Sequence, residues 1–139
     1  MKNKILTRLI PALAAIFLLS SCATTKYAQV IQGKWKMDTH LNNGIDDTEE
    51  FRNTYDSYGF EFENTGAYKE FFSMVGLINT TLGEWKIQNK DELLLRDLIT
   101  PDNSRTFKIL ELSKSRLRLK LKDVEFRMHP LADGEKMFR

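Results

Sequence analysis

The chain has 139 residues, a formal net charge of +2 and one cysteine. This length is enough for one domain with a buried core and too short for two, and a single cysteine excludes an intrachain disulfide. Without its first 21 residues the chain has 18 Lys and Arg against 19 Asp and Glu. Its charge therefore supports no binding to nucleic acid.

The first 21 residues have the organisation of a secretion signal. Lys2, Lys4 and Arg8 precede an apolar run over residues 9–19, and two small residues follow it. An apolar run of about 10–14 residues is too short to cross a bilayer, which needs about 20. These features predict a cleaved signal peptide over residues 1–21 rather than a membrane span.

Residues 19–22, Leu-Ser-Ser-Cys, resemble the lipobox of bacterial lipoproteins. The resemblance implies that Cys22 is lipidated, for example with palmitate, and anchors the protein to a membrane as its new N-terminus. Ala23 and Thr24 follow, with no aspartate and no acidic run. By the same resemblance this favours the outer membrane and its periplasmic face. An ordinary secreted protein with one free thiol is the alternative.

After a short tether over residues 22–32, apolar and polar residues alternate at a period of two, which is typical of strands buried on one face. The clearest case is residues 116–122, in which three leucines alternate with four cations. Turn residues, such as Asn-Thr-Gly at 64–66, separate the alternating segments. The predicted strands cover residues 33–38, 58–63, 67–71, 82–88, 93–95, 107–112, 116–122 and 124–129, with a bulge near Leu110.

About eight short strands with no long amphipathic helix between them predict an all-β, antiparallel up-and-down meander. Closing such a meander into a barrel buries one apolar face of every strand and removes exposed edges. We expect the barrel over residues 33–131, followed by a C-terminal tail over residues 132–139.

Two segments between the predicted strands are candidates for loops at the barrel mouth. Residues 41–57 are long and acidic, and Phe51 and Tyr55 have the i, i+4 spacing of a helical turn. Residues 73–81 include Leu77 and Ile78 and are unusually apolar for a loop. Two interpretations of this second segment stay open: a strand extension packed in the core, or an exposed portal rim or partner contact.

Charged residues are distributed unevenly along the domain. Residues 38–70 contain nine acids and two bases, whereas residues 105–127 contain eight bases and three acids. The simplest explanation is that oppositely charged outer faces lie near each other. Contact of the basic face with anionic lipid head groups is the alternative.

Residues 33–35, Gly-Lys-Trp, resemble the Gly-x-Trp signature of the lipocalins and their lipocalin-like bacterial relatives. Segments around residues 60–66, 83–87 and 109–119 extend the resemblance over nearly the whole domain. It implies a lipocalin-like (calycin) barrel, in which the glycine lets the backbone pass closely and the indole of Trp35 plugs one end. In lipocalins an arginine packs over that tryptophan. The nearest candidate, Arg127, points outward by its strand position.

The resemblance also implies that the barrel holds a small, usually apolar molecule. An eight-stranded barrel either holds one small ligand or is filled by its own side chains, so each interior aromatic residue is core or ligand wall. The interior residues expected at a ligand are Trp35, Met37, Phe60, Phe62, Trp85, Leu117, Leu119 and Phe126.

Few residues indicate catalysis. His40 and His129 are the only histidines and lack the spacing of a metal site, and no serine lies in a nucleophile elbow. We therefore expect no enzymatic activity and no cofactor or metal. Two functions stay open: a lipid-anchored carrier of a small apolar molecule, or a filled barrel that contacts an unidentified envelope protein through its loops.

Overall fold

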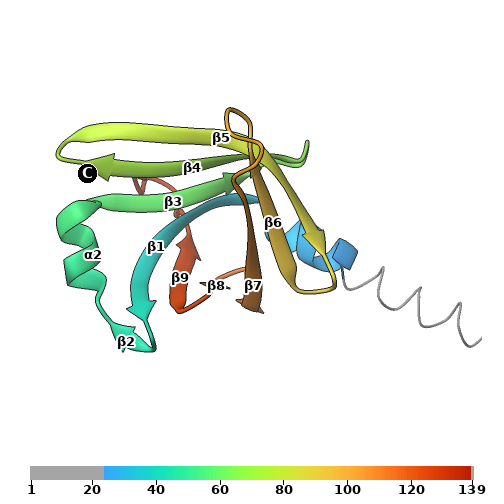
Figure 1. The fold of residues 1–139 in the computed structure, drawn as a ribbon, viewed down its shortest axis with the longest axis horizontal. Coiled ribbons are helices and arrows are strands. Elements are labelled where there is room, and N and C mark those ends of the chain that lie inside the picture. Colours follow the sequence, from blue (N-terminus) through green and yellow to red (C-terminus); the bar gives the residue numbers. More distant parts are fainter. Residues whose placement is uncertain (1–23, 139) are drawn as a thin grey trace, which may run out of the picture.

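The computed structural model describes residues 24–138, so the predicted signal peptide and Cys22 lie outside the described residues. Residues 24–30 are helical. The elements that follow are β1 Gly33–Asn42, β2 Ile45–Asp46, α2 Thr48–Thr54, β3 Ser57–Phe62, β4 Ala67–Met74, β5 Leu77–Gln88, β6 Glu92–Asp97, β7 Ser104–Leu112, β8 Leu117–Leu121 and β9 Val124–Pro130. Figure 1 shows the strands curling around a common interior.

Eight antiparallel strands form a closed barrel, because β1 pairs with both β3 and β9. The two-residue strand β2 adds only to β1. A register shift between Met37 and Thr39 interrupts the pairing of β1 with β9, and such irregularities bend a strand. The predicted all-β antiparallel barrel is therefore confirmed.

The inward-facing residues of the strands form one continuous apolar core, as the alternation predicts. A second register shift lies between Ile109 and Glu111 in the pairing of β7 with β8, at the predicted bulge. The largest fully buried side chains are Ile31, Trp35, Phe60, Phe62, Tyr68, Leu93, Leu95, Phe107, Leu117, Leu119 and Met128.

The segment before β1 closes one end of the barrel. Ile31 is fully buried, and Tyr27 and Ala28 pack against the core, so the last part of the expected tether belongs to the folded domain. The buried indole of Trp35 donates a 2.7 Å hydrogen bond to the carbonyl oxygen of Ile31. Gly33 has φ +118° and open space where a Cβ would lie. Position 33 therefore favours glycine because of its positive φ, and not because another part of the backbone passes close to it, as the resemblance implied.

The two segments expected at the barrel mouth consist mostly of regular structure, and residues 41–57 include a helix where the spacing of Phe51 and Tyr55 indicated one. Residues 73–81 are the end of β4, a turn at Val75 and Gly76 with positive φ, and the start of β5. Their backbone groups pair with each other across the hairpin. Residues 41–57 contain β2 and α2.

No helix among residues 24–138 is long and apolar enough to cross a bilayer.

The C-terminal tail packs on the outside of β3 and β4. The rings of Phe138 and Phe71 lie with their centroids 6.0 Å apart. Met137 covers Gly59 so closely that a Cβ at this glycine would come within 2.6 Å of the methionine sulfur. The tail therefore covers a strand surface that has no side chain of its own at this point.

Candidate functional site

The predicted interior residues lie together inside the barrel. Seven of them are buried: Trp35, Met37, Phe60, Phe62, Leu117, Leu119 and Phe126. Trp85 is only partly buried, and its indole donates to the carbonyl oxygen of Glu63 at 2.9 Å. The rings of Phe60 and Phe62 stack at 5.6 Å, and those of Tyr58 and Phe126 stack at 5.1 Å. Much of the interior is thus occupied by aromatic side chains of the protein itself.

Five polar side chains also lie on the inner face and form one hydrogen-bonded group, which we call the luminal polar cluster. Arg105 on β7 donates to both carboxylate oxygens of Glu70 on β4, with Nη1–Oε1 at 3.1 Å and Nη2–Oε2 at 2.6 Å. The hydroxyl of Tyr58 donates to Glu70, and that of Tyr68 donates to Asp97. Nη2 of Arg105 lies 3.6 Å from the Asp97 carboxylate.

Strand register explains why two charged residues point inward. Glu70 pairs with Phe60, and Arg105 pairs with Leu95. Residues directly opposite each other lie on the same face of the sheet. Glu70 and Arg105 therefore point inward, as their buried partners do. Sequence analysis missed this cluster because it assigned the charged residues to the outer faces. The available signal was spacing, since Arg105 precedes the inward Phe107 by two positions.

The members of the cluster set one another's protonation. Burial opposes the charge of Arg105, but its hydrogen bonds and attraction to Glu70 hold its pKa above the ordinary value. Burial and the negative charge of Glu70 raise the pKa of Tyr58. Burial and the hydrogen bond to Asp97 raise the pKa of Tyr68. Both tyrosines are therefore neutral donors at neutral pH, and the cluster contains one cation and two carboxylates.

The cluster lies between the aromatic interior and solvent. The exposed fractions are 10% for the Glu70 side chain, 15% for Asp97 and 26% for Arg105. Nε of Arg105 is buried and has no hydrogen-bond partner among the described residues. A buried donor without an acceptor is costly.

Helix α2 covers part of the barrel with aromatic rings. The ring of Phe51 stacks on His40 at 4.2 Å and meets Tyr58 edge-on at 5.6 Å. The ring of Tyr55 meets Phe72 at 5.8 Å. Phe51 and Tyr55 thus lie on and directly after a packed helix, not in an open loop. The helix fixes both side chains at the i, i+4 spacing seen in the sequence.

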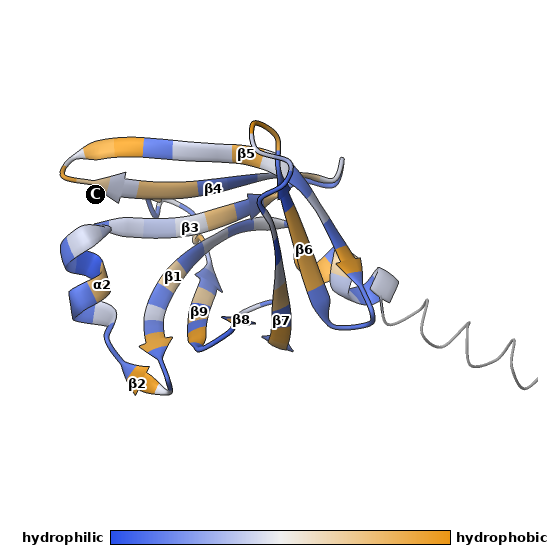
Figure 2. Ribbon diagram, in the orientation of Figure 1, coloured by the Kyte–Doolittle hydropathy of each residue, from blue (hydrophilic) through white to orange (hydrophobic). Residues whose placement is uncertain are grey.

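Leu77 and Ile78 lie on β5 with exposed fractions of 71% and 61%. The segment does extend a strand, as one interpretation predicted, but the prediction that its side chains pack in the core is wrong. Residues 77–82 pair with β4, whereas the register with β6 begins only at Gly83. This end of β5 is thus an exposed strand edge with apolar side chains, visible as orange segments in Figure 2.

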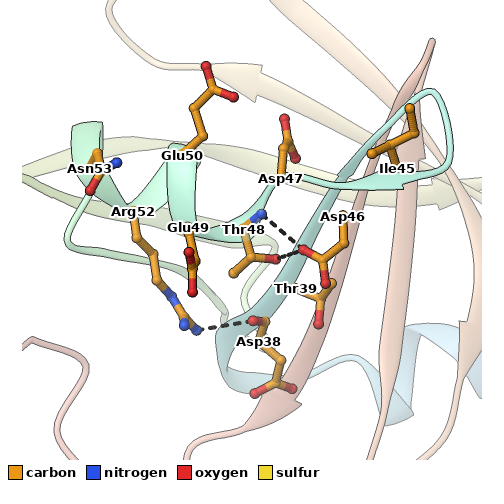
Figure 3. Close-up of a pocket in the computed structure, with 10 residues that line it drawn as sticks. All are labelled: Asp38, Thr39, Ile45, Asp46, Asp47, Thr48, Glu49, Glu50, Arg52 and Asn53. Atoms are coloured by element: carbon orange, nitrogen blue, oxygen red, sulfur yellow. Dashed lines mark hydrogen bonds between the residues drawn. The ribbon is translucent and has the colours of Figure 1, made fainter.

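An open pocket on the outer surface lies between β1, β2 and α2 (Figure 3). Asp46 accepts hydrogen bonds from the backbone N–H and the hydroxyl of Thr48 at 3.0 and 2.5 Å, which lower its pKa. Arg52 donates to the carbonyl oxygen of Asp38 at 3.0 Å. The bond from Arg52, in the last turn of α2, joins this helix to β1. Within residues 24–138, no three His, Cys, Asp or Glu side chains are placed to hold a metal ion.

Both histidines connect parts of the fold. Nδ1 of His40 lies 2.5 Å from an oxygen of Asp47, just before α2. His129 on β9 lies between Asp38 and Glu135, with Nδ1–Oδ1 at 2.5 Å and Nε2–Oε1 at 2.9 Å. His129 thereby joins the C-terminal tail to β1.

Comparisons with known proteins agree with this geometry. The family model of a lipocalin-like domain matches residues 31–119. A lipocalin-like protein from Bacteroides uniformis is similar in structure, with a TM-score of 0.59, 19% identity, and coverage of 72% of this chain and 97% of that one. An uncharacterized protein from Bacteroides eggerthii has a TM-score of 0.56, 17% identity, and coverage of 71% and 98%. A comparison with curated proteins found no match.

Proposed function

This chain belongs to the lipocalin-like domain family, and from that membership we propose that it binds or carries a small apolar molecule in the bacterial envelope. A lipocalin-like barrel suggests small-molecule binding. One observation carries the proposal: the barrel interior combines apolar side chains with a polar cluster that is partly open to solvent. Ligand sites typically combine apolar walls with a few placed polar groups.

Tyr58 connects the two parts of this proposed site. Its ring stacks on Phe126 and meets Phe60 edge-on at 5.5 Å, while its hydroxyl donates to Glu70. Phe51 on α2 packs against the same tyrosine ring. In this proposal the aromatic residues form the wall for an apolar chain, and the polar cluster receives its polar end.

We further propose that Cys22 carries the lipid anchor and that the protein is a non-enzymatic lipoprotein of the outer membrane, on its periplasmic side. The sequence before the cysteine supports this, and two or more acyl chains suffice for stable anchoring. The test is labelling of cells with radioactive palmitate. The protein should incorporate label and fractionate with outer membranes, and Cys22→Ala should lose both properties. Label retained by the Cys22→Ala variant would contradict the proposal.

The binding function is tested with protein that lacks residues 1–22, because the barrel and its closing segment lie within residues 24–138. Native mass spectrometry and organic extraction should detect a co-purified apolar molecule, and a neutral fluorescent probe should bind with saturation. Circular dichroism verifies that the sample is folded. A folded sample with no extractable molecule and no affinity for the probe would rule the function out.

A second function is favoured by a different observation. Leu77, Ile78 and Val75 are exposed apolar residues on one hairpin, and such groups mark protein contacts. A barrel filled by its own side chains that binds an envelope protein through this hairpin is therefore the alternative.

A further inference from the structure

We infer that the luminal polar cluster selects ligands whose polar end is an uncharged hydroxyl group and disfavours carboxylates. This inference rests on the proposed binding of an apolar molecule in the barrel, and it specifies the chemical class of that molecule. It comes from the charges and the unused hydrogen-bonding capacity of the cluster.

The charge of the cluster opposes a second anion. Glu70 faces the Arg105 guanidinium with both of its oxygens, a bidentate geometry that leaves little of the positive charge unmatched. Asp97 adds a second carboxylate beside the same guanidinium. A fatty-acid carboxylate would bring a third negative group into a partly buried site that has one cation, and repulsion there is stronger than in water.

The hydrogen-bonding capacity of the cluster suits a group that both accepts and donates. Nε of Arg105 has a proton to donate and no partner among the described residues. The hydroxyls of Tyr58 and Tyr68 are already used to donate to the two carboxylates, whose remaining lone pairs can accept. An alcohol oxygen can accept from Arg105 Nε while its proton is donated to a carboxylate. An ionised carboxylate can accept only.

The cluster is placed where a ligand's polar end can reach it. Arg105 is the most exposed of its three charged members, and the ring of Phe107 lies 5.8 Å from its guanidinium carbon. Phe107 belongs to the buried core and faces Phe60 at 6.3 Å. An alkyl chain that lies against Phe107 would bring its terminal oxygen to the guanidinium.

The test compares decanol with decanoate at pH 8, two ten-carbon chains that differ only in the polar end. Each competes with the neutral fluorescent probe for protein that lacks residues 1–22. We expect decanol to displace the probe at a concentration at least about tenfold lower than decanoate. In Glu70→Gln, which leaves Arg105 less neutralised, we expect this preference to shrink or reverse.

Glu61→Gln is the matched control, because Glu61 is a neighbouring carboxylate on β3 that pairs with Lys69 outside the lumen. It should keep the preference of the unmodified protein. If Glu70→Gln does not fold, Asp97→Asn removes the other carboxylate and should shift the preference in the same direction.

The outcomes separate the inference from the function on which it rests. Decanoate that competes as well as decanol would overturn the head-group selection and leave apolar binding intact. An unchanged preference in both Glu70→Gln and Asp97→Asn would also overturn it. Failure of the neutral probe itself to bind would overturn the proposed function and the inference together.

Discussion

The indole N–H of Trp35 donates to the carbonyl oxygen of Ile31 at 2.7 Å, and both side chains are buried. The bond ties the segment before β1 to the first strand of the barrel. Only nine positions separate Ile31 from Cys22. An anchor at Cys22 would therefore hold the closed end of the barrel near the membrane surface.

Trp35→Phe should lower the free energy of unfolding by about 2–4 kcal/mol, because it leaves a buried carbonyl oxygen without a donor and opens a small cavity. Urea denaturation followed by circular dichroism measures the change. Trp85→Phe is the matched control, since it removes a similar bond from a partly buried indole, and it should cost less. Equal losses in the two variants would show that the bond to Ile31 has no special role.

Gly83→Ala should destabilise the barrel by about 1–3 kcal/mol, the usual range for overpacking. A Cβ at this position would lie 2.1 Å from the backbone oxygen of Arg96 and 2.5 Å from Cε1 of Tyr68. The tyrosine must then move, which also disturbs its bond to Asp97. The thermal midpoint should fall clearly, whereas Thr80→Ala on the exposed part of β5 should leave it almost unchanged.

His129 should make the attachment of the C-terminal tail dependent on pH. Burial of the ring opposes protonation, but hydrogen bonds to Glu135 and Asp38 outweigh it and raise the pKa of His129. A raised pKa in the folded state gives stability that is complete below the unfolded pKa of about 6.5 and is lost as the pH rises through the folded pKa. The ring is partly exposed, so the contribution should stay below about 1 kcal/mol.

The acidic partner sets the lower limit of this pH window. Hydrogen bonds from the Ala132 N–H and His129 lower the pKa of Glu135, so its contribution is lost only when the pH falls through that lowered value. Thermal unfolding between pH 4 and 9 should show stability falling above about pH 6.5. The decline should be absent in His129→Gln. The same decline in both proteins would assign it to other groups.

Leu77→Ser with Ile78→Ser should change stability by less than about 1 kcal/mol, because both side chains are mostly exposed. Crosslinking in cells should lose a partner in this double variant if the hairpin is a protein contact. Leu93→Ser in the core is the control and should unfold the domain. A collapse of the double variant would show that the two side chains stabilise the fold, and a crosslink that persists would exclude the hairpin as the contact.

Several features of the fold could be predicted from the sequence. The alternation over residues 116–122 predicted β8 and its inward leucines, and the change of face near Leu110 predicted the bulge in β7. The strand position of Arg127 predicted that it points outward, where it donates to Glu125 at 3.1 Å. These features depend on the period of two within one strand, which is a local property of the backbone.

The sequence left residues 73–81 open between a strand extension packed in the core and an exposed rim, and the local pattern could not decide between them. Apolar residues such as Leu77 and Ile78 suggest burial, but the strand they form extends beyond the register with β6 and stays exposed. Where a hairpin ends relative to its neighbours depends on the pairing of other strands. The sequence of the hairpin carries no such information.

By itself, then, the sequence determined most of the barrel strands and the face of each that is apolar. Only the tertiary structure decided that Glu70 and Arg105, 35 positions apart, meet inside the barrel. Both lie at inward positions of their own strands, but which inward residues face each other depends on the stagger of all the strands when the sheet closes. That stagger is a property of the whole barrel, because every pairing contributes to it.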